Sequence, residues 1–288
     1  MRRPFARRAV KRFMPGEELS DALAAAKQLS AVRIGSVVTR LGETLTGESQ
    51  AEGVRDHYLG AYDDIQRAGL PAVVSVKLTQ LGLDHSFDTC LKHTQALAAK
   101  AAATGNQLWI DMEDSSYVDR TLTIYRRLKE QYDPVGLCLQ SYLRRTPQDL
   151  EALLPIRPWI RLVKGAYAEP PQIAYPAKKD VDQQYFSLSE RLLSAAAEEN
   201  VFAVFGTHDM DLVRQVVTRA ARLNVAPGGY EIHMLYGIRS AEQRALASEG
   251  RVVRCLISYG NQWFPWYMRR LAERPANAWF VVKSVFKG

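Results

Sequence analysis

The chain has 288 residues, 47% of them hydrophobic, and its 38 lysines and arginines against 31 aspartates and glutamates give a net charge of +7. This composition is typical of a globular protein with one large domain or two ordinary ones. No apolar run approaches the roughly 18 residues that a membrane-spanning helix needs. Three widely spaced cysteines argue against a disulfide framework and indicate a reducing compartment.

Residues 1–16 form a basic N-terminal segment without the apolar stretch of a secretory signal. Its charge suits an anionic membrane surface or nucleic acid, but a frayed soluble tail is the favoured interpretation. No stripe of basic and aromatic residues follows, which argues against a nucleic-acid-binding module. We therefore expect a cytoplasmic protein, with peripheral contact at the inner face of the membrane as the alternative.

In chain order, a predicted N-terminal helix over Glu17–Leu29 precedes eight short apolar, β-branched runs that predict strands. These runs are Val32–Thr39, Ala72–Leu78, Gln107–Met112, Val135–Gln140, Trp159–Lys164, Val201–Gly206, Tyr230–Leu235 and Val252–Ser258. Segments with helical periodicity lie between them, including Gln50–Ala68, Phe87–Thr104, Tyr117–Tyr132, Asp182–Asn200 and Leu212–Leu223. Eight β-then-α units in about 250 residues predict one (β/α)8 barrel, with 1–288 as a single domain.

The carboxyl ends of barrel strands carry the active site, and six consecutive predicted strands end in polar side chains. A buried charge costs several kcal/mol unless it is paired or binds a ligand, so these ends predict a lined pocket. Its cations are Lys77, Arg161 and Lys164, and Asp111 is the expected partner of Lys77. The positive excess favours an anionic ligand, and a phosphorylated substrate, a pyrophosphate cofactor or a carboxylate would each fit. No spacing of cysteines and histidines matches a usual metal site.

Near the C-terminus, a helix beginning after Pro265 would place Trp266, Arg269, Arg270 and Glu273 on one face. An aromatic wall beside two guanidinium groups suits a small carboxylate. A basic surface helix with Trp266 packed on the core is the alternative.

With these motifs in order, the chain resembles the proline dehydrogenases, both the monofunctional bacterial enzymes and the dehydrogenase domain of bifunctional proline utilisation proteins. The matching motifs are Lys77–Gly82, Asp111–Ser115, Leu139–Leu143, Arg161–Tyr167, Thr207–Asp209, Leu235–Gly237 and Arg269–Pro275. The resemblance implies a distorted (β/α)8 TIM barrel that binds FAD. It also implies hydride transfer from C5 of proline to flavin N5, which gives 1-pyrroline-5-carboxylate, and electron transfer to a quinone. A pyrroline-5-carboxylate dehydrogenase is an expected partner.

The resemblance also implies roles for individual residues. Arg269, Arg270 and Lys77 resemble a clamp for the substrate carboxylate. Asp111 resembles the residue that positions Lys77. Arg161 resembles the hydrogen-bond donor near flavin N5. The implied pocket walls are Tyr167 and Leu235, with Leu256 and Trp266 at the ring. The implied flavin contacts are Gln140, Arg161, Val163, Lys164, Lys178, Thr207, His208 and Glu273.

Two positions depart from the family pattern: Leu256 and Trp266 stand where the family usually has tyrosines around the proline ring. Amine oxidation is still expected, but an N-alkylated, substituted or larger-ring cyclic amino acid becomes an alternative substrate. A non-catalytic flavin-binding regulator is a second alternative. A phosphate-handling barrel such as an aldolase, with Lys164 as a Schiff-base lysine, is a third.

Overall fold

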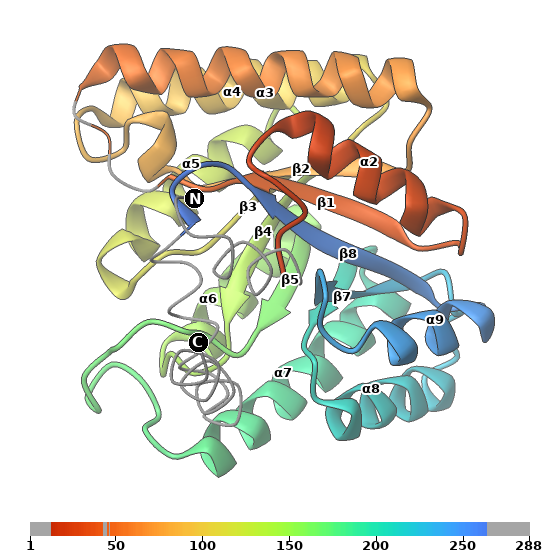
Figure 1. Cartoon of the computed structure of the whole chain (residues 1–288). Helices are drawn as coiled ribbons and strands as arrows, with labels where there is room; N and C mark the ends of the chain where they lie inside the picture. Colours follow the sequence, from red (N-terminus) through yellow and green to blue (C-terminus); the bar gives the residue numbers. More distant parts are fainter. Residues whose placement is uncertain (1–12, 43–44, 46, 264–288) are drawn as a thin grey trace, which may run out of the picture.

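A computed structural model of the protein describes residues 13–42, 45 and 47–263. Eight parallel strands are each hydrogen-bonded to the next along the chain, and β8 pairs with β1 to close a barrel (Figure 1). The strands are β1 (Gly35–Arg40), β2 (Ala72–Val76), β3 (Leu108–Ile110), β4 (Val135–Gln140), β5 (Trp159–Val163), β6 (Phe202–Gly206), β7 (Tyr230–Leu235) and β8 (Val252–Tyr259).

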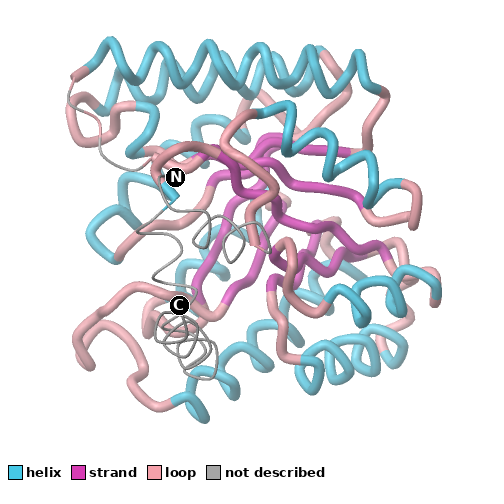
Figure 2. The backbone as a smooth tube through the Cα atoms, viewed as in Figure 1, coloured by secondary structure: helices cyan, strands magenta, loops and turns pink. Residues whose placement is uncertain are grey.

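Helices surround this barrel on the outside, as Figure 2 shows. The α-helices of the described residues are α2 (Leu19–Ser30), α3 (Glu48–Ala68), α4 (Phe87–Ala103), α5 (Val118–Lys129), α6 (Thr146–Leu153), α7 (Lys178–Glu198), α8 (Met210–Arg222) and α9 (Ser240–Ser248). Short 3-10 helices are η1 (Thr79–Leu81), η2 (Ser115–Tyr117) and η3 (Leu154–Ile156). The N-terminal helix α2 packs across β1 and β8, over the place where the barrel closes.

The predicted barrel with an extra N-terminal helix is confirmed, and all eight predicted strands overlap the observed ones. The largest strand error is at β1, which begins three residues later than predicted. There the chain after α2 turns first: Arg33 has a left-handed φ of 61°, and Val32 and Ile34 both donate backbone hydrogen bonds to Leu29 O. The expected helix over Tyr117–Tyr132 is observed as η2 followed by α5.

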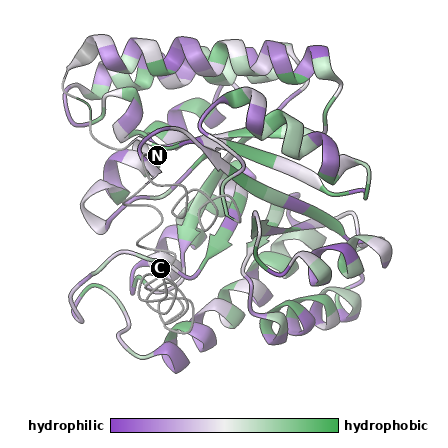
Figure 3. Cartoon of the chain, in the orientation of Figure 1, coloured by the Kyte–Doolittle hydropathy of each residue, from purple (hydrophilic) through white to green (hydrophobic). Residues whose placement is uncertain are grey.

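The strands separate two apolar layers, because successive side chains of a strand point to opposite faces. Inside the barrel, Val37, Val73, Trp109 and Val204 form a small buried cluster. The residues between them face the helices and join a much larger cluster. In Figure 3 the strands are coloured mostly as hydrophobic, while purple hydrophilic residues recur along the outer helices. Polar side chains that lie inside the barrel therefore stand out as candidates for a site.

Candidate active site

An ion pair inside the barrel joins the end of β3 to β5. Arg161 Nη2 donates hydrogen bonds to Asp111 Oδ1 and, at 3.0 Å, to Ser75 Oγ, which in turn donates to Asp111 Oδ1 at 2.9 Å. The Arg161 side chain is 3% exposed and the Asp111 side chain 18% exposed. Removing one partner of a buried ion pair leaves the other charge uncompensated and destabilises the fold by about 3–5 kcal/mol.

Strand register explains why these three side chains meet. Asp111 follows β3 directly, and its backbone N–H donates to Val76 O at 2.8 Å, which continues the β2–β3 ladder. Because side chains alternate, Ser75 and the residue two positions later, Lys77, share the inner face of β2. Lys77 therefore stands beside Asp111 at this end of the barrel, as the sequence predicts, and their pairing stays a prediction.

Gln140 and Val163 lie side by side at the ends of β4 and β5, where the strand register pairs them. Gln140 is 3% exposed. Its Nε2 donates weakly to Met112 O at 3.4 Å. Its Oε1, like Arg161 Nη1, is buried without a hydrogen-bond partner among the described residues. Each such atom costs about 1–3 kcal/mol unless a ligand satisfies it.

Lys164, at the end of β5, belongs to a cluster with two carboxylates and a second lysine. Its Nζ donates to Asp182 Oδ1 at 2.5 Å and to Asp209 Oδ2 at 3.1 Å. Lys178, at the start of α7, also donates to Asp182 and lies 3.7 Å from Asp209 Oδ2. Burial raises the pKa of each carboxyl, but the lysine hydrogen bonds outweigh it and hold both below their ordinary values. The Lys164 amine is engaged by two carboxylates, which argues against a Schiff-base lysine.

Farther around the barrel from β5, the neighbouring strands β7 and β8 bring Leu235 and Leu256 together. The two leucines are register partners. His208 holds this corner, since its Nε2 accepts a hydrogen bond from the backbone N–H of Leu235 at 2.8 Å. Thr207, 6% exposed, accepts through Oγ1 from the backbone N–H of Asp209 at 3.1 Å. The result is an apolar wall beside polar groups, the combination that small-molecule sites use.

Backbone hydrogen bonds join the loops after β4 and β5 next to this site. The backbone N–H of Tyr142 donates to Lys164 O at 2.9 Å, and Leu143 pairs with Ala174 in an isolated bridge. Gly165 allows this approach: its φ is +108°, and a Cβ there would lie 2.2 Å from the Tyr142 ring. The segment that begins with Tyr167 is therefore held at the mouth by backbone contacts.

The structure brings together, at one end of the barrel, the predicted site residues that it describes. Arg269, Arg270, Trp266 and Glu273 lie outside the described residues, and so do the first twelve residues of the basic segment. Tyr167 is partly buried at the mouth.

Sequence reasoning missed Ser75, Trp109 and His233 as parts of the site. Each stands two residues before a predicted site residue, on the inner face of β2, β3 or β7. Period-two spacing back from Lys77, Asp111 and Leu235 was the signal that would have found them. Asp209 was named only within the Thr207–Asp209 motif, and Asp182 gave no signal because it lies on α7, which follows a long loop.

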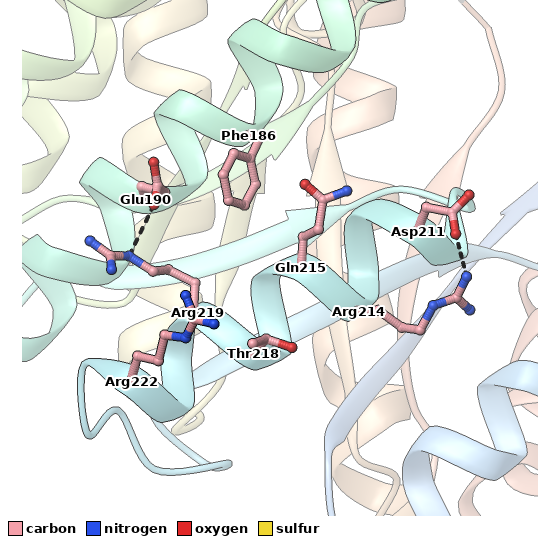
Figure 4. Close-up of a pocket in the computed structure, with 8 residues that line it drawn as sticks. All are labelled: Phe186, Glu190, Asp211, Arg214, Gln215, Thr218, Arg219 and Arg222. Atoms are coloured by element: carbon pink, nitrogen blue, oxygen red, sulfur yellow. Dashed lines mark hydrogen bonds and ion pairs between the residues drawn. The ribbon is translucent and has the colours of Figure 1, made fainter.

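A second charged hollow lies outside the barrel, between α7 and α8 (Figure 4). Arg214 pairs with Asp211, and Arg219 Nε lies 3.0 Å from Glu190 Oε1. The Arg214 and Asp211 side chains are 68% and 78% exposed, so their pair contributes about 0–1 kcal/mol. These charges satisfy each other at the surface, and we assign the chemistry to the barrel mouth.

The sequence matches known proteins over most of its length. A family model described as proline dehydrogenase matches residues 22–283. The chain belongs to the proline dehydrogenase family. It is 36% identical over 282 residues to proline dehydrogenase 1 of Bacillus subtilis (strain 168), covering 98% of this chain and 92% of that relative. Proline dehydrogenase of Deinococcus radiodurans is likewise 36% identical, with 96% and 90% covered.

Solved structures confirm the fold. Proline utilization A from Bdellovibrio bacteriovorus inactivated by N-propargylglycine superimposes with a TM-score of 0.84 at 23% identity, over 91% of this chain. Proline utilization A from Corynebacterium freiburgense gives a TM-score of 0.79 at 19% identity, over 94% of this chain. The chain spans about a third of the length of these two proteins, 32% in each case.

Proposed function

We propose that the protein is an FAD-dependent dehydrogenase that oxidises proline to 1-pyrroline-5-carboxylate. The observation that carries the proposal is the buried polar set inside the mouth: Arg161 paired with Asp111 and Ser75, with Gln140 beside it. Membership of the proline dehydrogenase family supports the substrate and the reaction class.

The residues present fit a flavin. Arg161 Nη1 is a donor and Gln140 Oε1 an acceptor, and both are buried without partners among the described residues. An isoalloxazine edge offers acceptors and an N–H donor, which is the set that these two atoms lack. When bound, the flavin would supply the hydride acceptor. Arg161 would favour the negative charge that develops there, because its guanidinium is fixed by Asp111 and Ser75 before the reaction begins.

Other residues around the mouth would hold the remainder of the cofactor. Lys164 and Lys178 stand where β5 and α7 meet and suit the phosphates, in exchange for part of their bonding to Asp182 and Asp209. Val163, Thr207 and His208 line the neighbouring strand ends, and Glu273 is proposed from sequence alone.

For the substrate, Lys77 with Arg269 and Arg270 would bind the carboxylate, and Asp111 would keep Lys77 in place. Hydride transfer from C5 needs the ring held in one orientation, which a carboxylate clamp at one end and an apolar wall at the other achieve. Tyr167, Leu235 and Leu256 would form that wall, with Trp266 added from the C-terminal segment.

An alternative substrate is a proline analogue, and the register pairing of Leu256 with Leu235 favours it. Leu256 stands beside Leu235 where the family usually has a tyrosine hydroxyl, so an apolar substituent or a larger ring would bury surface there. The reaction would be the same.

We propose that electrons pass to a quinone and that the product passes to a pyrroline-5-carboxylate dehydrogenase. A cytoplasmic enzyme with peripheral membrane contact would meet such an acceptor. None of the helices among the described residues is long and apolar enough to span a bilayer.

The test is to purify the protein, extract its chromophore and identify it by chromatography. We expect FAD, bleached anaerobically by proline or by a proline analogue. FMN, or no flavin after reconstitution with FAD, contradicts the cofactor assignment. Stoichiometric FAD that no cyclic amino acid reduces indicates the non-catalytic flavin-binding regulator.

A further inference from the structure

Inside the barrel, the Arg161 guanidinium packs against a buried indole. The Arg161 guanidinium carbon lies 5.2 Å from the centroid of the Trp109 ring. Trp109 is completely buried, and its Nε1 donates to Gln107 Oε1 at 3.0 Å. A guanidinium at this distance over an indole is attracted by the ring's negative face, most strongly where water is excluded.

Trp109 also contacts a second buried network. The His233 ring meets the indole edge to face, with centroids 5.8 Å apart and an interplanar angle of 67°. His233 Nε2 is 2.8 Å from Glu231 Oε2, and the same oxygen accepts from Arg254 Nε at 2.8 Å. The indole thus packs against an imidazole that a carboxylate orients.

Gly136 on β4 fixes the indole from the side. A Cβ at this position would lie 2.4 Å from Trp109 Cε3, so the ring rests directly on the β4 backbone. Trp109 therefore contacts Arg161, His233 and the backbone of Gly136. Little space remains for another ring orientation.

The protonation states of Glu231 and His233 at neutral pH are compatible with these contacts. Burial raises the pKa of Glu231, but hydrogen bonds from His233 and Arg254 outweigh it and lower the pKa to about 2. Burial lowers the pKa of His233 to about 4, despite Glu231. The imidazole is therefore neutral and donates to a carboxylate. It adds no positive charge near Arg161.

We propose that Trp109 is a positioning residue that sets the direction of the Arg161 guanidinium at the mouth, and that His233 and Glu231 hold the indole in place. The inference rests on the proposed role of Arg161 toward the flavin. Trp109 touches neither substrate nor cofactor in this assignment and acts through Arg161.

Two indoles inside the barrel allow a matched comparison. Trp159 packs against the same inner cluster, with its ring 5.0 Å from that of Phe202. Trp109 is the indole that contacts the Arg161 guanidinium. The variants are Trp109→Leu, the milder Trp109→Phe and the control Trp159→Leu. Each is also combined with Arg161→Met. Flavin content and melting temperature are measured for every variant.

The first readout needs no flavin. In apoprotein labelled with ¹⁵N-arginine, the Arg161 Nε–H resonance is assigned by its loss in Arg161→Lys. We expect Trp109→Leu to shift this resonance, because the indole ring current is lost, and Trp159→Leu to leave it in place. An unshifted Arg161 resonance in Trp109→Leu overturns the proposal whatever the cofactor.

The second readout uses the FAD-loaded enzyme. We expect Trp109→Leu to lower kcat about tenfold, the size of a buried cation–π contact. The flavin reduction potential should fall while the KM for proline changes little, and Trp109→Phe should keep most of the activity. In the Arg161→Met background, Trp109→Leu should add no further loss, because Trp109 acts through Arg161.

The outcomes separate the two proposals. Additive losses in the double variant, or an equal fall in potential in Trp159→Leu, show that Trp109 only fills the core and overturn the positioning role. A shifted Arg161 resonance together with an unchanged potential in both Arg161→Met and Trp109→Leu supports the positioning of Arg161. That combination contradicts its proposed role toward the flavin instead.

Discussion

The two ends of the barrel interior hold similar charges but differ in how completely those charges are bonded. At the amino-terminal end, Arg254 donates through Nε to Glu231 and through Nη1 to Pro71 O at 3.3 Å. At the carboxyl end, Arg161 is paired with Asp111, yet its Nη1 is buried and has no partner among the described residues.

The comparison shows how to distinguish a structural polar network from a binding site in one barrel. The amino-terminal network leaves only His233 Nδ1 unpartnered among its described atoms, and a neutral imidazole nitrogen costs less to bury than a guanidinium N–H. The carboxyl-end network leaves both a cationic donor and an amide acceptor open. A ligand with complementary atoms would complete it, whereas Glu231, His233 and Arg254 of the other network already bond to one another.

The largest expected effect is at the carboxyl end. Arg161→Met should lower kcat roughly a thousandfold, because a fixed donor to the developing charge is lost. It should also destabilise the fold by about 3 kcal/mol, since the partly buried Asp111 carboxylate loses its counter-charge. Steady-state kinetics, flavin content and urea unfolding measure the two effects separately.

The matched control is Arg214→Met, which breaks the exposed pair with Asp211 on α8. Stability should change by less than about 0.5 kcal/mol and kcat should not change. If Arg161→Met behaves like this control, the contrast between buried and exposed ion pairs does not locate the site.

Arg270→Met tests the carboxylate clamp, which sequence alone places at the mouth. We expect kcat/KM for proline to fall by about 10- to 100-fold, because one charge-assisted hydrogen bond contributes roughly 1.5–3 kcal/mol. Flavin content should remain near normal. Pyrrolidine, which lacks the carboxylate, should be a poor substrate of the unaltered enzyme. Equal oxidation of pyrrolidine and proline would show that no clamp operates.

The amino-terminal network of Glu231, His233 and Arg254 should be detectable in the pH dependence of stability. As pH falls below 6.5, the unfolded chain binds a proton at His233, while the folded protein keeps this imidazole neutral down to about pH 4. Stability is therefore complete above the ordinary pKa and declines with acidification, by roughly 3 kcal/mol over this window. Glu231, with its pKa lowered to about 2 from 4.5, extends the loss to lower pH.

His233→Gln should flatten the upper part of this acid dependence. The measurement is the free energy of unfolding in urea at several pH values between about 7 and 4, for both proteins. Parallel curves would mean that His233 does not carry the pH dependence.

The smallest effect concerns substrate choice at the apolar side of the mouth. The double change Leu256→Tyr with Trp266→Tyr should move preference toward proline by about tenfold, because it restores hydroxyls and changes the volume around the ring. The unaltered enzyme should tolerate apolar-substituted, N-alkylated or six-membered-ring acids better, at roughly 0.8 kcal/mol per buried CH₂. A panel of kcat/KM values, with flavin content checked, decides this. If the unaltered enzyme already discriminates as sharply, these two positions do not set specificity.

Much of the fold was readable from the sequence because each strand is a compact apolar, β-branched run between amphipathic helices. The runs Val135–Gln140 and Tyr230–Leu235 match β4 and β7 at both ends. The start of β1 was misplaced because Val32 and Ile34 continue the apolar pattern into a turn. Local hydrophobicity does not distinguish a turn that packs on a core from the strand that follows it.

The candidate site was predicted as a set of strand ends but not as a set of contacts. Arg161 reaches Asp111 although β5 and β3 are not neighbouring strands, and this contact depends on barrel curvature and on the two-residue alternation inside it. Trp109 and His233 were invisible as partners for the same reason. Lys164 was predicted as a contact, but its carboxylate partners come from the starts of α7 and α8, whose positions follow from loop paths.

The pairing of β1 with β8 has a consequence for how the chain reaches this structure. Residue 36 pairs with residue 255, and α2 lies across the same two strands, so the barrel closes between the two ends of the described chain. Contacts so distant in sequence are slow to form and come late during synthesis. Until β8 leaves the ribosome, β1 and β7 each present an unpaired edge to other chains. We expect chains truncated before Val252 to aggregate, even though most of the proposed cofactor contacts would already have been made.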